Sequence, residues 1–219
     1  MIHHIAGPLG RLEALLDHPA ASCTTGKPPA ETSEAGPHVP RAVVVLAHPH
    51  PVHGGTMNSK VVFQAAKAFC RVGCAVLRFN FRGAGTSEGS FSEGPGEQDD
   101  YRAALDFAAE RFPGSEIWAV GASFGSWVAM TVGAGDPRVT LLAGIAAPAG
   151  TYDFSAVAAS EKRKVFVHGE HDFIAPARAL WEFYATASEP KDIVIIDAAD
   201  HLFDGRLAEM ADALEGLVA

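Results

Sequence analysis

From residue 42 onward, short apolar segments alternate with segments whose apolar residues recur at helical spacing, and this alternation constrains the fold more than any other feature. The apolar segments predict strands at 42–47, 74–79, 116–121, 140–145, 164–169 and 192–197. Several lack regular polar positions, which is typical of strands buried on both faces of a sheet. In the first helical segment, one face carries Val62, Phe63, Ala66, Phe69 and Cys70. The repeated order predicts an α/β fold with a mostly parallel, doubly wound sheet and helices on both faces.

The residues before this alternation predict a β-hairpin followed by a loop. Residues 2–6 and 11–18 flank the turn sequence GPLG at 7–10. Residues 19–40 are rich in Pro, Ala, Thr, Gly and Ser and have no periodic apolar face, so we expect a mobile surface loop. Because the chain has 219 residues, of which 48% are hydrophobic, we expect a single domain over 1–219.

The composition argues against several classes of partner. The formal net charge of −9 disfavours nucleic acid, because phosphate backbones select basic surfaces. Cys23, Cys70 and Cys74 do not form a disulfide framework, so we expect a reducing, cytoplasmic location. The first residues lack the pattern of a signal peptide, and no apolar run approaches the ~20 residues that span a bilayer. We therefore expect no nucleic acid and no membrane as partners.

The sharpest functional motif is GASFG at 121–125, which directly follows an apolar segment and precedes an apolar helical pattern. This is G-x-S-x-G in a strand–turn–helix setting, which exposes a nucleophilic serine at the C-terminal edge of a sheet. Glycines suit such a strained turn, because neighbouring backbones leave no room for a Cβ. The start of the helix directs its N–H groups and its dipole toward the same point. We predict Ser123 as a nucleophile.

A serine hydroxyl needs a base that accepts its proton, and the base needs an acid that orients it. Two late segments supply these groups. His201 lies in the loop after the last predicted strand, and Asp172 lies in the loop after the strand before it. We predict His201 as the base and Asp172 as the acid, with Glu170 as the alternative acid.

Three motifs together resemble the α/β-hydrolase superfamily, and more narrowly its small lidless bacterial hydrolases. They are HPHPVHGGTMN at 48–58, RFNFRGAGTSEG at 78–89 and GASFG at 121–125. The resemblance covers about residues 41–219, and dienelactone hydrolases and small carboxylesterases are its wider neighbours. It implies an α/β-hydrolase fold without a cap domain, a triad in the order Ser, Asp, His, and no cofactor. Residues 19–40 depart from the compact pattern, which bears on access or assembly rather than on catalysis.

The resemblance also assigns residues 47–55 to a loop that supplies half of the oxyanion hole. Such a hole needs backbone N–H groups, and Pro49 and Pro51 have none. Between them only His50 is a donor. We therefore pair the N–H of His50 with the N–H of Phe124 as the predicted oxyanion hole.

Two features suggest a bound cofactor, and neither pattern is complete. His48, His50 and His53 suggest a metal site, but no Cys or carboxylate lies nearby in the sequence, so we predict no metal. A buried imidazole that braces the loop is the simpler explanation of His48. The glycines at 83–89 suggest a dinucleotide site, but the third comes one position late and no helix follows at once.

The segment 146–163 joins two late strands and is too short for a helical cap, so we expect an open site. Candidates for its substrate-binding walls, and equally for the core, are Trp127, Tyr152, Phe154 and Phe173. The function expected is hydrolysis of a small, short-acyl ester through an acyl-enzyme. A thioesterase or a C–C bond hydrolase with the same triad is the alternative, as is a catalytically vestigial binding protein. We expect a small-molecule ester as partner, and a homodimer because open small hydrolases often pair.

Overall fold

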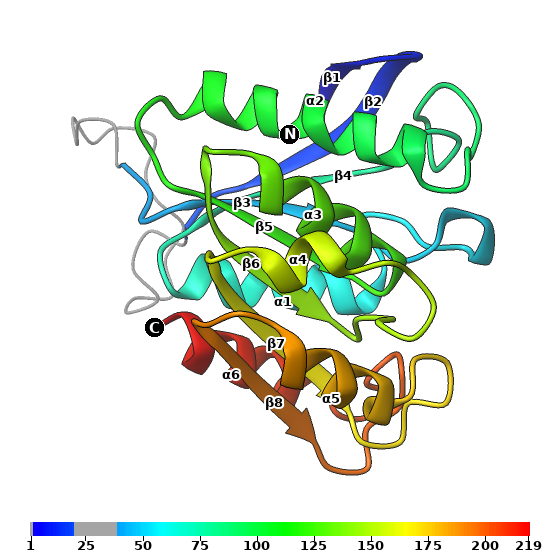
Figure 1. Ribbon diagram of the computed structural model, residues 1–219. Helices are drawn as coiled ribbons and strands as arrows, with labels where there is room; N and C mark the ends of the chain where they lie inside the picture. The colour runs from blue at the N-terminus through cyan, green and yellow to red at the C-terminus, as the bar shows by residue number, and fades with distance from the viewer. Residues whose placement is uncertain (1, 20–38) are drawn as a thin grey trace.

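The computed structural model describes residues 2–19 and 39–219, which form an eight-stranded sheet with helices on both faces (Figure 1). The strand order is β1-β2-β4-β3-β5-β6-β7-β8. The strands are β1 (Ile2–Gly7), β2 (Gly10–Asp17), β3 (Val43–Ala47), β4 (Ala75–Phe79), β5 (Ile117–Ala122), β6 (Val139–Ile145), β7 (Arg163–Gly169) and β8 (Lys191–Ile196). The predicted hairpin is β1 with β2, which also pairs antiparallel with β4, and all other pairs are parallel. The predicted mostly parallel α/β fold is confirmed.

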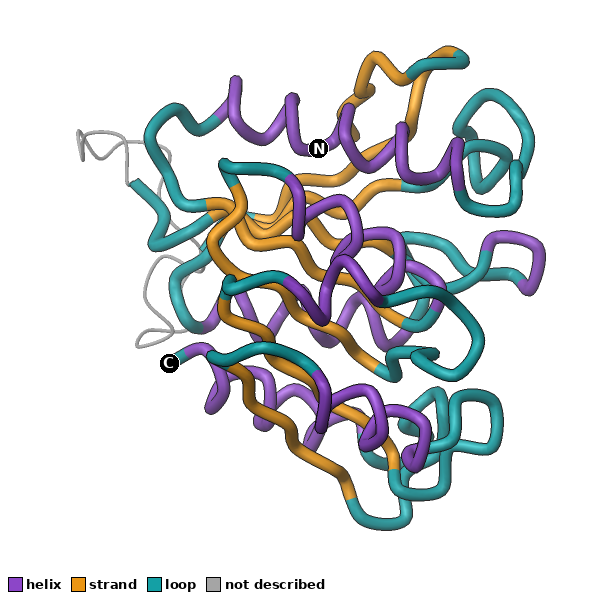
Figure 2. The backbone as a smooth tube through the Cα atoms, viewed as in Figure 1, coloured by secondary structure: helices purple, strands orange, loops and turns teal. Residues whose placement is uncertain are grey.

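The helices divide between the two faces of the sheet (Figure 2). They are α1 (Lys60–Arg71), α2 (Pro95–Arg111), α3 (Phe124–Gly135), α4 (Ser155–Ala159), α5 (Ala177–Thr186) and α6 (Leu207–Val218), and a 3-10 turn, η1 (Pro51–His53), precedes α1. Buried residues of α1 and α6 share one apolar core, and those of α2, α3, α4 and α5 share the other. The sheet is therefore doubly wound, as predicted.

The central strands serve both cores, which explains the wholly apolar sequences of β3 and β5. In β3, Val43, Val45 and Ala47 pack toward α2 and α3, whereas Val44 and Leu46 pack toward α1 and α6. Because successive side chains of a strand point to opposite faces, a strand between two helical layers buries both faces and favours apolar residues. The parallel strands also end at one edge of the sheet, where the loops after β3, β5, β7 and β8 gather.

One part of the prediction for α1 is wrong. Phe63 was expected on the buried face, yet its side chain is 44% exposed. The buried residues of this helix are Val61, Val62, Ala65, Ala66, Ala68 and Phe69. Because α1 packs on α6 as well as on the sheet, its buried face is turned toward the smaller side chains and Phe63 is turned outward.

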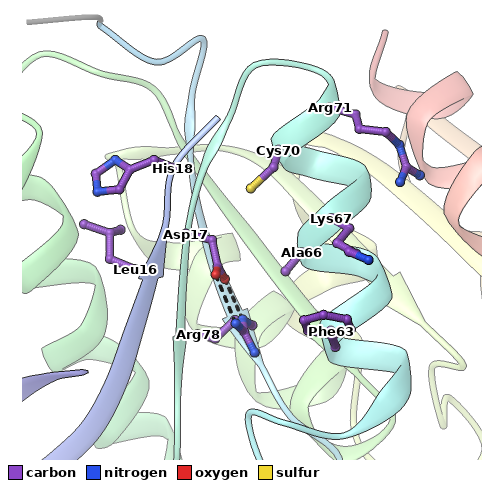
Figure 3. A pocket seen from close by; sticks show the side chains of 9 residues that line it. All are labelled: Leu16, Asp17, His18, Phe63, Ala66, Lys67, Cys70, Arg71 and Arg78. Atoms are coloured by element: carbon purple, nitrogen blue, oxygen red, sulfur yellow. Dashed lines mark hydrogen bonds and ion pairs between the residues drawn. The ribbon is translucent and has the colours of Figure 1, made fainter. Parts of the chain in front are cut away.

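Phe63 lines a cavity of ≈ 510 Å³ between α1 and β2 (Figure 3). The buried cation of this cavity, Arg78, already has its partners within the protein. Arg78 donates from Nε and Nη2 to the carboxylate of Asp17, at 2.6 and 3.1 Å, and from Nη1 to the carbonyl of Met57 at 2.8 Å. None of the residues that line the cavity comes from the loops after β3, β5, β7 or β8.

No cap interrupts the described part of the fold. Between β6 and β7 the chain carries only the five-residue helix α4. The loop predicted at 19–40 lies, apart from its end residues, outside the described residues, as does Cys23. Among the helices of the two described ranges, none is both long and apolar enough to cross a membrane.

Candidate functional site

Ser123 stands between β5 and α3 in a strained backbone conformation. Its φ of 51° and ψ of −124° are unusual for a residue with a Cβ. A Cβ at Gly121 would collide with the carbonyl oxygen of Gly125, and a Cβ at Gly125 would collide with that of His48. Both glycines of the motif are therefore required by close backbone contact, and the turn directs the serine to the sheet edge.

Three side chains from three loops meet at this edge. Nε2 of His201 lies 2.8 Å from Oγ of Ser123, and Nδ1 of His201 lies 2.7 Å from Oδ2 of Asp172. The serine follows β5, the aspartate follows β7 and the histidine follows β8. The structure thus brings together the three residues that the sequence patterns selected, in one continuous hydrogen-bonded row.

The carboxylate beside His201 belongs to Asp172 and not to Glu170. Asp172 is buried, and its Oδ1 accepts the backbone N–H groups of Ile174 at 2.9 Å and Ala175 at 2.7 Å. Its other oxygen is thereby left to His201. The side chain of Glu170 is exposed and accepts the N–H of Ala198 at 2.9 Å.

The two predicted oxyanion donors are the backbone N–H groups of His50 and Phe124, two residues whose side-chain rings pack together. Phe124 is the first residue of α3, so its N–H has no intrahelical acceptor. Its ring centroid lies 5.0 Å from that of His50. Within the described residues we find no hydrogen-bond acceptor for the backbone N–H of either residue. Both groups are therefore free to donate to a ligand.

His48 braces the loop after β3 from the inside. Its buried Nε2 accepts the N–H of Phe81 at 3.0 Å, so Nδ1 carries the proton and donates to the carbonyl of Pro49 at 2.6 Å. Burial lowers the pKa of His48 to about 4, which keeps the ring neutral. With both nitrogens engaged, His48 has none left for a metal. In the described residues, no group of three or more His, Cys, Asp or Glu side chains is arranged to hold a metal ion.

The glycine-containing motif at 78–89 also supports the loop after β3. Asn80 accepts the N–H of Met57 at 2.8 Å and donates to the carboxylate of Glu13 at 2.8 Å. Gly85 has a φ of 56°, and a Cβ there would collide with the amide of Asn80. The motif therefore ties the loop after β3 to the hairpin, and its three glycines all have a positive φ, which explains why glycine stands at these positions.

Two of the predicted pocket walls pack against Phe124, the residue that follows Ser123. The rings of Trp127 and Tyr152 are stacked, with centroids 4.5 Å apart, and each lies 5.7 Å from the ring of Phe124. Sequence reasoning missed Phe91, whose ring lies 5.8 Å from that of Phe124 and 4.7 Å from that of His50. No local pattern marks Phe91, because a long-range loop contact brings it to the site.

The other two predicted walls are placed differently. Phe154 is buried in the core, where its ring lies 5.5 Å from that of Phe183. The sequence favoured neither role, and this packing of α4 on α5 favours the core, while the assignment of Phe154 to the pocket stays a prediction. Phe173 follows Asp172 directly but is 90% exposed, so it projects into solvent and forms no enclosed wall.

Comparison with known proteins gives consistent results. The family model of "Serine aminopeptidase, S33" matches residues 38–165. The chain is 36% identical over 187 residues to the uncharacterized protein RP471 of Rickettsia prowazekii, covering 81% of this chain and 78% of that protein. An α/β serine hydrolase homologue from Coxiella burnetii is 32% identical with a TM-score of 0.87, over 100% of this chain and 97% of that one. XC6422 from Xanthomonas campestris, a serine hydrolase without a lid, is 32% identical with a TM-score of 0.86, over 100% and 93%.

Proposed function

The chain belongs to the α/β-hydrolase superfamily, in the serine aminopeptidase, S33, family. We propose that it is a carboxylesterase that cleaves small, short-acyl esters. The observation that supports this most is the continuous hydrogen bonding from Ser123 through His201 to Asp172. A serine hydroxyl in contact with a neutral imidazole loses its proton as it attacks, and a buried carboxylate fixes the required tautomer.

In the first half-reaction, Oγ of Ser123 attacks the ester carbonyl carbon while Nε2 of His201 takes the hydroxyl proton. The carbonyl oxygen becomes an oxyanion that the N–H groups of His50 and Phe124 stabilise. As this tetrahedral species collapses, the carbon–oxygen bond to the alcohol breaks. His201 gives its proton to the departing oxygen, so the alcohol leaves and the acyl group stays on Ser123.

In the second half-reaction, a water molecule attacks the acyl carbon. His201 takes a proton from this water, and the same two N–H groups stabilise the second oxyanion. The bond between the acyl carbon and Oγ of Ser123 then breaks, and His201 returns the proton to the serine. Asp172 stays ionised throughout and stabilises the charged imidazole. The products are one carboxylic acid and one alcohol.

The surroundings of Ser123 support a small substrate. The segment between β6 and β7 carries only α4, which leaves the site open. The aromatic side chains of Phe91, Trp127 and Tyr152 pack around Phe124, the residue that follows the proposed nucleophile. An apolar wall of this kind favours an uncharged acyl group over a charged one.

Two experiments test the proposal. A fluorophosphonate probe should label the wild type and not Ser123→Ala. Hydrolysis of nitrophenyl acetate, butyrate and octanoate should then be compared with that of matched thioesters and an aminoacyl anilide. We expect the highest kcat/KM with a short ester. No labelling of folded wild-type protein would contradict a serine hydrolase. A preference for thioesters or anilides would keep Ser123 as the nucleophile but overturn the ester assignment.

A further inference from the structure

His168 is a buried side chain whose role the triad does not include. In the described residues, the side-chain polar atoms that are buried without a hydrogen-bond partner are Nδ1 of His168 and Oγ1 of Thr131. His168 lies on β7, shortly before Asp172, and is fully buried. A buried ring nitrogen without a partner lowers the stability of the folded protein, so its presence calls for a physical reason.

The hydrogen bond of His168 fixes its tautomer. Nε2 lies 2.7 Å from the carbonyl oxygen of Ala175. A carbonyl only accepts, so Nε2 carries the proton and Nδ1 is left as a lone pair with no donor. Burial lowers the pKa of His168 and outweighs the nearby carboxylate of Asp172, so the ring is neutral.

This hydrogen bond acts on the turn that holds the triad acid. The carbonyl of Ala175 accepts from His168, and the N–H of the same residue donates to Oδ1 of Asp172 at 2.7 Å. Nε2 of His168 also lies 3.5 Å from Oδ2 of Asp172, the oxygen that bonds His201. The ring therefore lies against both the carbonyl of Ala175 and the carboxylate of Asp172.

We propose that His168 is a positioning residue for Asp172, because it holds the carbonyl of Ala175 and thereby fixes the turn that directs Oδ2 toward His201. Simple packing does not explain the residue, since methionine or leucine would fill the space without an unpaired nitrogen. The proposal rests on the proposed function for the role of Asp172, but the geometry it concerns exists without turnover.

The test compares two substitutions at one position. His168→Met keeps the bulk and removes the donor, whereas His168→Gln retains an amide N–H at a similar reach toward Ala175. Misplacing a catalytic group by about 1 Å costs on the order of 100-fold in rate. We therefore expect His168→Met to lower kcat about 10- to 100-fold with KM within about twofold, and His168→Gln to restore kcat to within about threefold of the wild type. Thr131→Val, which removes the other unpaired buried atom, is the control and should keep the wild-type kcat.

A second readout is the proton resonance of the Nδ1–H bond between His201 and Asp172, recorded on the folded proteins without substrate. It should be alike in the wild type and His168→Gln, and shifted or lost in His168→Met. Unchanged kcat and an unchanged resonance in His168→Met would overturn the proposal. A kcat of His168→Gln no higher than that of His168→Met would overturn it as well. Should His168→Met not fold, a loss of tenfold or more in His168→Gln overturns it, and a loss of threefold or less supports it. If the wild type hydrolyses no ester and takes no probe, the proposed function fails while the resonance still tests His168.

Discussion

Two buried histidines brace the two sides of the site, and they do so differently. On the oxyanion side, His48 uses both ring nitrogens, one as a donor to Pro49 and one as an acceptor from Phe81. On the acid side, His168 uses only Nε2, on Ala175, and leaves Nδ1 unpaired. The loop after β3 (the proposed oxyanion loop) is therefore held by a ring whose two nitrogens are both hydrogen-bonded. The turn after β7 (the proposed acid turn) is held by a ring with one unpaired nitrogen, at a cost in stability.

The two histidines differ in their hydrogen bonding because the two sides of the site hold different groups in place. The loop after β3 offers a backbone N–H, and prolines on either side of His50 already restrict that backbone. The turn after β7 must instead direct a side chain, Asp172, and it does so through two backbone N–H groups and one carbonyl. The carbonyl of this turn takes its donor from the core, and His168 provides it.

The largest expected effect is on the acid side. Asp172→Asn should lower kcat by about 10⁴-fold, because an amide favours the wrong tautomer of the base. KM should change little, since Asp172 is buried beneath the imidazole. Steady-state kinetics on a short ester measures the change. Glu170→Gln is the matched control, because that exposed carboxylate contacts Ala198 and His171 and, among the residues that the structure describes, makes no hydrogen bond to the triad. A larger loss in Glu170→Gln would transfer the acid role to Glu170.

The next effect is on the oxyanion side, where the N–H of His50 can be removed with little disturbance. The φ of His50 is −52°, close to the value that proline adopts, and its N–H has no acceptor within the described residues. His50→Pro should therefore fold and lose about 10²- to 10³-fold in kcat, the usual effect of one oxyanion donor.

His50→Ala is the control for this substitution, because it also removes the imidazole ring but keeps the N–H. It should retain most of kcat and act mainly through KM, since the ring of His50 packs beside Phe91 and Phe124. Circular dichroism establishes that both variants are folded. Equal loss of kcat in the two variants would assign the effect to the ring and remove the N–H from the oxyanion hole.

The sequence predicted what depends on local pattern. Wholly apolar runs predicted the strands, because a strand between two helical layers packs both faces, and G-x-S-x-G predicted the turn at Ser123, because backbone contacts forbid a Cβ at Gly121 and Gly125. The structure also brings His201 and Asp172 to that serine, while their catalytic roles stay predictions.

What the sequence did not predict depends on contacts between distant segments. Phe63 lies outside the buried face because α1 also packs on α6, and helical spacing alone does not say where a second helix will lie. Phe154 packs against Phe183, and Phe91 reaches Phe124 from another loop. The role of His168 depends on the turn after β7, which brings the carbonyl of Ala175 back to the His168 ring. No spacing of residue types reveals this contact.

The smallest effect concerns the stability that His48 contributes, and its sign follows from burial. The pKa of His48 is about 4 in the folded protein and about 6.5 in the unfolded chain, so the unfolded chain binds the proton more readily. Its contribution is complete above pH 6.5 and is lost as the pH falls toward 4. Between pH 7 and pH 5 the loss is about 2 kcal/mol.

Urea unfolding of the wild type and of His48→Gln at the two pH values isolates this contribution, because groups common to both proteins cancel in the difference. The stability gap between the two proteins should narrow by about 2 kcal/mol on going from pH 7 to pH 5. His53→Gln, at an exposed position in the same loop, is the control for loop substitutions in general. A gap that stays constant with pH would mean that the ring of His48 is not buried and neutral, and the oxyanion loop would then lack the internal brace that distinguishes it from the acid turn.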